Sequence, residues 1–341
     1  MKKLVIVLLV QICASFIMAQ SVNSDVSKRG TTAAEFLCIG QGARSMGMGG
    51  AFTGVVQDAS GLYWNPAGTA EYEGANIFFD HTEWFADIKY NYVAGTYKVP
   101  GFGTIGMGLT FSDVGDIPVT TISAPNGTGE TFSVKDIAFS VSYALKLTDR
   151  FSIGFNPKVV YQSIWKTSAT ALALDMGVKY VTPFDDAVLA MSISNFGQKM
   201  KLEGNSTIVL YDGDLTTTGN NDKIPANLST DEWALPLIFR VGLSYSPLHT
   251  MLNRLILAAD AVHPSNNYEY MNVGAEYTYN DFISIRGGYK SLFLKDSEEG
   301  LCLGFGIKYG LVGNIVLNVD YAYQDFGRLE YVQKISFGVN F

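Results

Sequence analysis

The sequence predicts a transmembrane antiparallel β-barrel of about fourteen strands that encloses an N-terminal plug. From about residue 76 to the last residue, short runs alternate large apolar residues with small or polar ones. Charged residues make up 16% of the chain, below the roughly 25% usual in soluble proteins. No apolar run of about 20 residues follows the N-terminal segment, which excludes membrane-spanning helices. On composition alone, a large soluble β-sandwich remains the alternative.

Residues 1–20 have the features of a secretory signal peptide. Lys2 and Lys3 form a basic start, an apolar core follows, and Ala19 is the small residue expected before a cleavage site. We therefore expect cleavage after Ala19 or Gln20 and export of the mature chain. An exported β-barrel is expected in the cell outer membrane, where lipid would surround the barrel wall.

Residues 21–74 are expected to form the plug, because their apolar patches have no other core to join. Thr32 and Glu35 fit a capping box, which predicts a short helix that starts there. Gly47, Gly49 and Gly50 permit close approach of the backbone to other elements.

A second short helix is expected near residues 58–63. It should stop at Asn65-Pro66, because proline disfavours the helical conformation in the residue before it.

Residues 75–341 are expected to form the barrel, in runs near the ~9–11 residues that a tilted spanning strand needs. In the clearest run, residues 328–341, Ile335, Phe337 and Val339 share one face while Lys334 and Ser336 fall on the other. The small, sparsely charged polar face suits a lumen, and the apolar face suits lipid. The runs cover residues 75–81, 87–99, 104–112, 131–147, 151–165, 169–182, 187–196, 236–246, 254–263, 268–279, 282–291, 300–309, 314–324 and 328–341.

The connections between these runs alternate in length. Short connections lie near residues 100–103, 148–150, 183–186, 247–253, 280–281 and 310–313. Most of the others are longer, above all 113–130 and 197–235. Outer-membrane barrels have short periplasmic turns and longer outer loops, so both ends of the chain are expected in the periplasm.

Two sets of residues are candidates for binding. Large outer loops on a rigid barrel are places of recognition, so the loop 197–235 is a candidate for protein partners. Its candidate contacts are Leu210, Tyr211, Trp233 and Leu235. A hydrophobic ligand would instead need an apolar pocket between plug and wall, although a packed plug core would use the same residues. The candidate residues of that pocket are Phe36, Leu37, Met46, Met48 and Phe52.

The sequence predicts no enzyme, with no catalytic residue, no metal site and no cofactor. His81, His249 and His263 lie far apart, without the spacing of metal ligands, and no nucleotide-binding or hydrolase motif occurs. A formal net charge of -8 and the absence of a basic tract argue against nucleic acid as a partner. The two mature cysteines, Cys38 and Cys302, are either separate thiols or one bond from plug to wall.

Three motifs carry a resemblance to a known family. They are Phe36-Leu37-x-Ile39-Gly40-x-Gly42-Ala43-Arg44, Met48-Gly49-Gly50-Ala51 and Trp64-Asn65-Pro66-Ala67-Gly68. Together they resemble the opening of the PorV/PorQ family of outer-membrane proteins. That family is similar to the FadL-type fatty-acid transporters, barrels with an N-terminal hatch that share the Asn65-Pro66-Ala67 triplet.

The resemblance implies a role in the type IX secretion system. PorV-like barrels bind the translocon and secreted cargo and help to pass cargo to a surface-attachment complex. The resemblance does not separate a PorV-like from a PorQ-like role. The alternative that it implies is a FadL-like transporter of long-chain fatty acids or other hydrophobic small molecules.

Overall fold

The computed structural model describes residues 28–341 except 185–186, 214–215, 217–222 and 312–314. The predicted signal peptide lies outside the described residues.

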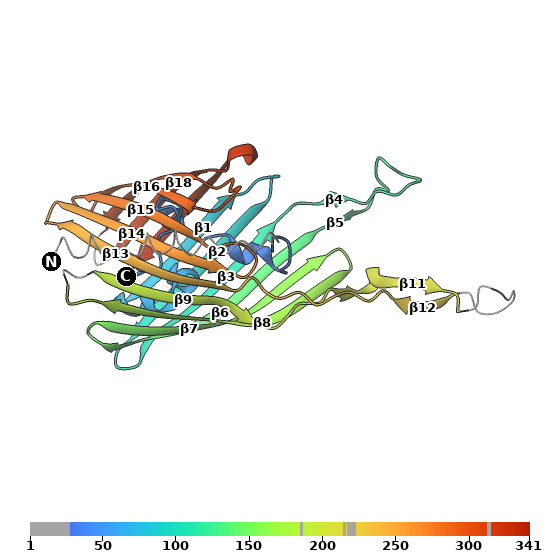
Figure 1. The fold of residues 1–341 in the computed structure, drawn as a ribbon, viewed down its shortest axis with the longest axis horizontal. Helices are drawn as coiled ribbons and strands as arrows, with labels where there is room; N and C mark the ends of the chain where they lie inside the picture. The colour runs from blue at the N-terminus through green and yellow to red at the C-terminus, as the bar shows by residue number, and fades with distance from the viewer. Residues whose placement is uncertain (1–27, 185–186, 214–215, 217–222, 312–314) are drawn as a thin grey trace.

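The barrel wall consists of fourteen antiparallel strands (Figure 1). Each strand pairs with its neighbour in the chain, β9 pairs with both β8 and β13, and β19 returns to pair with β1, which closes the wall. The predicted fold is therefore confirmed, and each predicted run overlaps one of the fourteen wall strands. The strands are β1 (Ala75–Glu83), β2 (Lys89–Val99), β3 (Gly103–Asp113), β6 (Val134–Thr148), β7 (Phe151–Ile164), β8 (Thr167–Val181), β9 (Val188–Gly197), β13 (Ile238–His249), β14 (Asn253–Pro264), β15 (Tyr270–Tyr279), β16 (Ile283–Leu292), β17 (Leu301–Gly310), β18 (Val316–Asp325) and β19 (Tyr331–Asn340).

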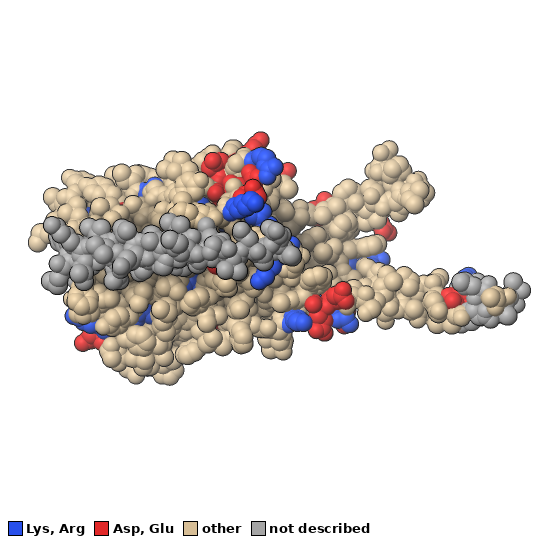
Figure 2. Space-filling view, in the orientation of Figure 1, with Lys and Arg blue, Asp and Glu red and all other residues tan. Residues whose placement is uncertain are grey.

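The two faces of the wall differ as the alternation predicts. On β3, Ile105, Met107 and Leu109 are exposed on the outside, whereas Gly106 and Gly108 between them are buried. Large apolar side chains on the outer face are suited to lipid. Figure 2 agrees, because charged side chains gather mainly near the two ends of the barrel in this view. Among the described residues, no helix is long and apolar enough to cross a membrane.

The N-terminal segment lies inside the barrel and contains four short helical elements (Figure 1). They are η1 (Glu35–Cys38), α2 (Ala43–Gly47), α3 (Gly61–Trp64) and η2 (Pro66–Glu71). The side chains of Ala43, Met48 and Phe52 are almost completely buried, which is the burial expected of a packed plug.

Two details of the plug differ from the sequence analysis. The capping box is wrong, because the Thr32 hydroxyl bonds the Glu35 side chain and the residue before η1 is Ala34, in a left-handed conformation without a side-chain cap. The second helix starts later than expected, at Gly61, but it ends before Asn65 as predicted. Asn65 is extended, with φ −161° and ψ 103°, as a residue before proline should be.

Two outer loops extend beyond the end of the barrel that lies away from the C-terminus (Figure 1). One carries the hairpin of β4 (Ile117–Pro118) and β5 (Thr131–Phe132). The other carries β10 (Glu203–Gly204), η3 (Asn205–Thr207) and a ribbon of β11 (Ile208–Tyr211) and β12 (Ile224–Asn227). The remaining outer connections are short, down to a two-residue turn at Trp165–Lys166, and the last contains η4 (Gly327–Leu329).

A labelling experiment tests the orientation of the barrel in the membrane. A cysteine at Gly213, beyond the ribbon, should react with a membrane-impermeant thiol reagent on intact cells. A cysteine at Asp149, in the turn between β6 and β7, should react only after the outer membrane is opened. The reverse pattern of labelling would place the ribbon in the periplasm.

Candidate functional site: the plug, the wall and the outer ribbon

Glycines on the inner face of the wall let the plug backbone touch the strands. A Cβ atom added to Gly274 on β15 or Gly288 on β16 would overlap the backbone of Met48 or of Met48 and Gly49. A Cβ added to Gly154 on β7 would overlap the backbone at Pro66. The small inner residues are therefore not simply the lining of an open lumen. They are the places where plug and wall meet backbone to backbone.

Polar side chains of the wall satisfy the backbone of the plug. The Asp260 carboxylate accepts hydrogen bonds from the backbone N–H groups of Phe52 at 3.0 Å and Thr53 at 2.9 Å. The Asn156 amide donates to the carbonyl of Leu62 at 3.0 Å, and Asn76 accepts from the N–H of Ala59 at 2.6 Å. An irregular buried chain leaves polar groups that cost free energy unless they are bonded. The wall supplies these partners.

An ion-pair network fixes α2 to the wall. Arg44 donates two bonds to the Glu276 carboxylate, each 2.7 Å long. Arg286 donates to the same carboxylate at 2.6 Å and to Asp320 at 2.7 Å. Two guanidinium groups and two carboxylates thus balance one another inside the barrel. A second pair, Lys334 and Asp80 at 3.1 Å, lies beside the start of α2.

Asn65 explains the Asn-Pro-Ala-Gly motif. Its side chain is buried, accepts from the N–H of Ala67 at 3.1 Å, and donates to the carbonyls of Thr53 and of Val178 on β8. One residue thus caps η2, ties two parts of the plug together and joins the plug to the wall. Position 68 of the motif requires glycine, because a Cβ atom there would lie 2.6 Å from the carbonyl oxygen of Val56.

The other motif residues also have packing roles. A Cβ at Gly40 would meet the Trp64 ring at 2.9 Å, and Gly42 has a left-handed φ of 96°. The N–H of Gly42 donates to Asp80 at 3.0 Å, and that of Ala43 donates to Ser336 at 2.6 Å.

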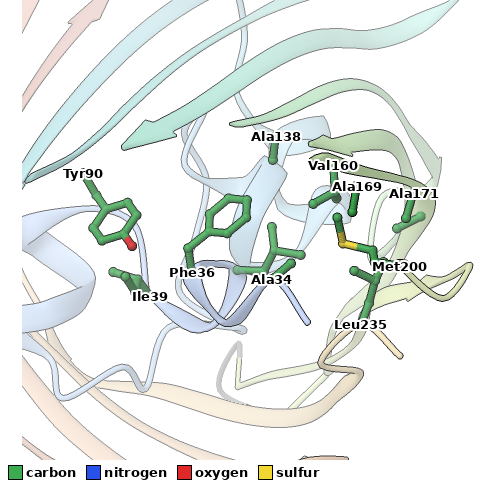
Figure 3. Packing of buried hydrophobic residues seen from close by; sticks show 12 residues of the cluster. Ala34, Phe36, Ile39, Tyr90, Ala138, Val160, Ala169, Ala171, Met200 and Leu235 are labelled. Carbon is green, nitrogen blue, oxygen red and sulfur yellow. The ribbon is translucent and has the colours of Figure 1, made fainter. Parts of the chain in front are cut away.

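The five residues of the predicted apolar pocket do not line one common pocket, because they belong to three separate packed clusters, although Phe36 and Leu37 line a small cavity of about 30 Å³ against the wall. Phe36 and Leu37 pack with Ala34, Tyr90 and Ala138 (Figure 3). Met48 and Phe52 pack around Trp64. Met46 packs with residues of β18 and β19. As the sequence analysis anticipated, a packed plug core uses these side chains.

The predicted partner-binding residues divide into two groups. Leu210 and Tyr211 on β11 are 65% and 57% exposed, and Trp233 is also exposed. Leu235 is only 3% exposed and packs on Met200 near the Phe36 cluster (Figure 3), so its assignment as a partner contact is wrong. Its role is to anchor the base of the loop.

A cavity of about 230 Å³ lies between the plug and the outer ends of β13 to β16, a site that the sequence analysis missed. Tyr63, Trp64, Tyr270 and Arg240 contribute to its lining, and the Arg240 guanidinium lies 5.3 Å from the centre of the Trp64 ring. In the sequence, Arg240 is one charged residue of the predicted run 236–246. Nothing in the sequence shows that it meets the plug aromatics.

The cavity also touches Cys38, whose thiol pKa is raised by burial to about 12. Cys38 and Cys302 are both free thiols, so the structure does not join plug and wall by a disulfide.

Comparison with known proteins agrees with this architecture. Residues 22–176 match the family described as type IX secretion system protein PorV. None of the curated proteins compared with the chain matches it.

Solved structures with the same fold are distant in sequence. The monoaromatic hydrocarbon channel CymD is 14% identical, with a TM-score of 0.55 and coverage of 88% of this chain and 96% of CymD. The Ralstonia pickettii toluene transporter TbuX is 13% identical, with a TM-score of 0.52 and coverage of 88% and 97%. A Pseudomonas aeruginosa FadL homologue is 12% identical, with a TM-score of 0.53 and coverage of 88% and 98%.

The motifs around the plug and the fourteen-stranded wall thus point the same way as the comparisons. The chain is an outer-membrane β-barrel with the FadL-like fold, and its residues 22–176 are similar to the PorV family.

Proposed function

We propose that this barrel is a type IX secretion component that binds translocon, cargo or surface-attachment proteins through its outer ribbon. The observation that carries the proposal is the exposed apolar surface of β11 and β12. Ile208, Leu210, Tyr211 and Ile224 are all exposed, and they come from both faces of the ribbon.

The position of the ribbon supports a protein partner over lipid. The ribbon extends past the end of the wall, and charged side chains gather near its junction with the barrel (Figure 2). The ion pair of Lys201 and Glu203 belongs to the start of this loop. Apolar side chains held in water beyond a charged zone are typical of protein interaction sites.

The base of the loop is fixed, which suits recognition. β10 pairs with β8 through Glu203 and Ser168, and Met200 pairs with Trp233 across the base. Leu235 is buried beside Met200. A ribbon on an ordered base loses less conformational entropy on binding than a free loop does.

A shortened loop tests the proposal. Removal of residues 207–229 should leave the barrel folded, because no barrel strand lies in that range. Cargo with type IX signals should then accumulate in the periplasm. A finer variant replaces Leu210 and Tyr211 with aspartate, which should give the same defect by removing the apolar contact.

A matched control is Ile122→Asp, at the other outer hairpin, where the side chain is fully exposed. It adds a charge outside the ribbon and should leave cargo release unchanged. Normal cargo release with the shortened ribbon, in cells whose barrel is folded and abundant, would refute the ribbon as the binding site.

A second candidate function is transport of a hydrophobic small molecule. The observation that favours it is the 230 Å³ cavity, in which aromatic rings lie beside a cation at the plug. The fold neighbours are described as hydrocarbon channels and transporters, which supports the same alternative. It predicts that uptake of long-chain fatty acids falls when residues 21–68 of the plug are removed, and that cargo release stays normal when the ribbon is shortened.

A further inference from the structure

A second cavity lies at the opposite end of the plug, toward the C-terminal end of the barrel, and has a volume of about 160 Å³. The plug contributes Arg44, Gln57 and the chain at Gly54 and Val55. The wall contributes basic side chains from three strands, together with serine and tyrosine hydroxyls. They are Lys179 on β8, His249 on β13, Arg254 on β14, Ser244, Tyr245 and Ser246. Among its described lining residues there is no aspartate or glutamate.

The donors that line this cavity outnumber their partners within the protein. The Arg254 guanidinium, with five N–H donors, makes no hydrogen bond or ion pair with the described residues. Lys179 has three donors, of which one goes to the carbonyl of Val56 and one to Glu71. The Arg44 guanidinium has five N–H donors, of which two bond to Glu276. Cationic donors that face a cavity without a lining carboxylate favour an anion or ordered water.

Acidic side chains do occur next to this cavity, and most of them are paired. The adjoining cavity of about 170 Å³ shares Arg44, Gln57 and Arg254, and it also contacts Asp58, Glu276, Asp281 and Asp320. Glu276 and Asp320 are bonded to arginines, and Asp281 is bonded to Lys308 at 2.6 Å. Asp58 accepts from the N–H of Ser60 at 3.0 Å. Glu71, which lines neither cavity, is bonded to Lys179 at 2.8 Å, and Arg254 lines both cavities without a carboxylate partner among the described residues.

We propose that the cavity between Arg44, Lys179, His249 and Arg254 binds a small anion that carries a carboxylate or phosphate group. A guanidinium binds either group through two parallel bonds, and the nearby serine hydroxyls add neutral donors. The volume of 160 Å³ is several times the ~30 Å³ share of one water molecule. It therefore has room for a molecule of a few non-hydrogen atoms. The site is separate from the outer ribbon and does not depend on the function proposed for it.

Calorimetric titration of the full chain, folded in detergent micelles, tests the proposal with two probes. Inorganic phosphate and succinate are titrated separately at constant ionic strength, with sodium chloride as the baseline salt, so that general screening cancels. At least one probe should bind saturably at one site per chain. The probe that binds more tightly identifies the group, phosphate or carboxylate.

Variants connect the binding to the cavity. Arg254→Gln should weaken binding at least ~10-fold, because it removes the unpaired guanidinium. Arg150→Gln changes an exposed arginine in the turn between β6 and β7 and should leave binding unchanged. His249→Gln changes an exposed side chain and should weaken binding about threefold. Absence of saturable binding of both probes, or binding in both Arg254→Gln and His249→Gln that equals binding in the unmodified chain, would overturn the proposal.

Discussion

Replacing Glu276 with glutamine should lower the free energy of unfolding by about 3–5 kcal/mol, because it leaves buried charges without their counter-charge. Glu276 accepts two bonds from Arg44 and one from Arg286, and its side chain is buried. In the variant, Arg286 keeps its ion pair with Asp320, whereas Arg44 loses its ion-pair partner. Urea unfolding of the barrel in detergent, followed by tryptophan fluorescence and by gel mobility, measures the change.

The control for this change is Glu298→Gln. Glu298 pairs with Arg328 through a contact of the same kind, but the Arg328 side chain is exposed. Solvent screens such a pair, so the unfolding midpoint should not move measurably. Equal behaviour of the two variants would show that the inner network does not hold the plug in the barrel.

Replacing Gly49 with valine should also destabilise the barrel strongly, for two reasons that a control can separate. Gly49 has a φ of 63°, and a Cβ there would lie 2.7 Å from the backbone nitrogen of Tyr289 on β16. The backbone strain should cost about 1–3 kcal/mol and the overlap about 1–3 kcal/mol more.

The matched control is Gly101→Val. Gly101 has a similar φ of 74° in an exposed turn, with nothing within 4 Å of a Cβ atom. This variant carries the strain without the overlap. The difference in unfolding free energy between the two variants therefore measures the close contact of plug and wall. A difference near zero would mean that the plug backbone does not pack on β16.

The strands could be predicted from the sequence because each strand contacts lipid on one face and the plug on the other. That arrangement forces a period of two, and β17 shows it, with Leu301, Leu303 and Phe305 outside and Cys302 buried. A one-residue shift of register would place the wrong residues in lipid, so the pattern is strongly constrained. The two longest loops could also be predicted, because the alternation of apolar and polar residues stops where they begin.

The plug could be predicted only as a glycine-rich segment. Its conformation depends on partners that lie about 100 to 300 residues away in the chain, such as Glu276 for Arg44 and Asp260 for Phe52. No local pattern encodes those contacts, and the capping box failed because Thr32 found a side-chain partner instead of a backbone one. The wall glycines could be seen in the sequence. Glycine on the inner face is expected both for an open lumen and for close contact with a plug, so it does not distinguish the two.

The errors in the candidate sites have a similar cause. Composition identifies Leu235 and Leu210 equally as apolar loop residues, but only tertiary packing buries the first and leaves the second exposed. The five residues of the apolar pocket are indeed buried, but in three separate clusters. The sequence predicts that such residues avoid water, not which neighbours they pack against.

A strain that lacks this chain and has no paralogue of it provides the most direct test of the proposed function. Two quantities are measured in it, release of cargo with type IX signals to the cell surface and uptake of long-chain fatty acids. The proposal predicts that cargo stays in the periplasm while uptake is unchanged, and that the full chain, but not the chain without residues 207–229, restores release. Normal release together with impaired uptake would contradict the secretion role and favour the transporter.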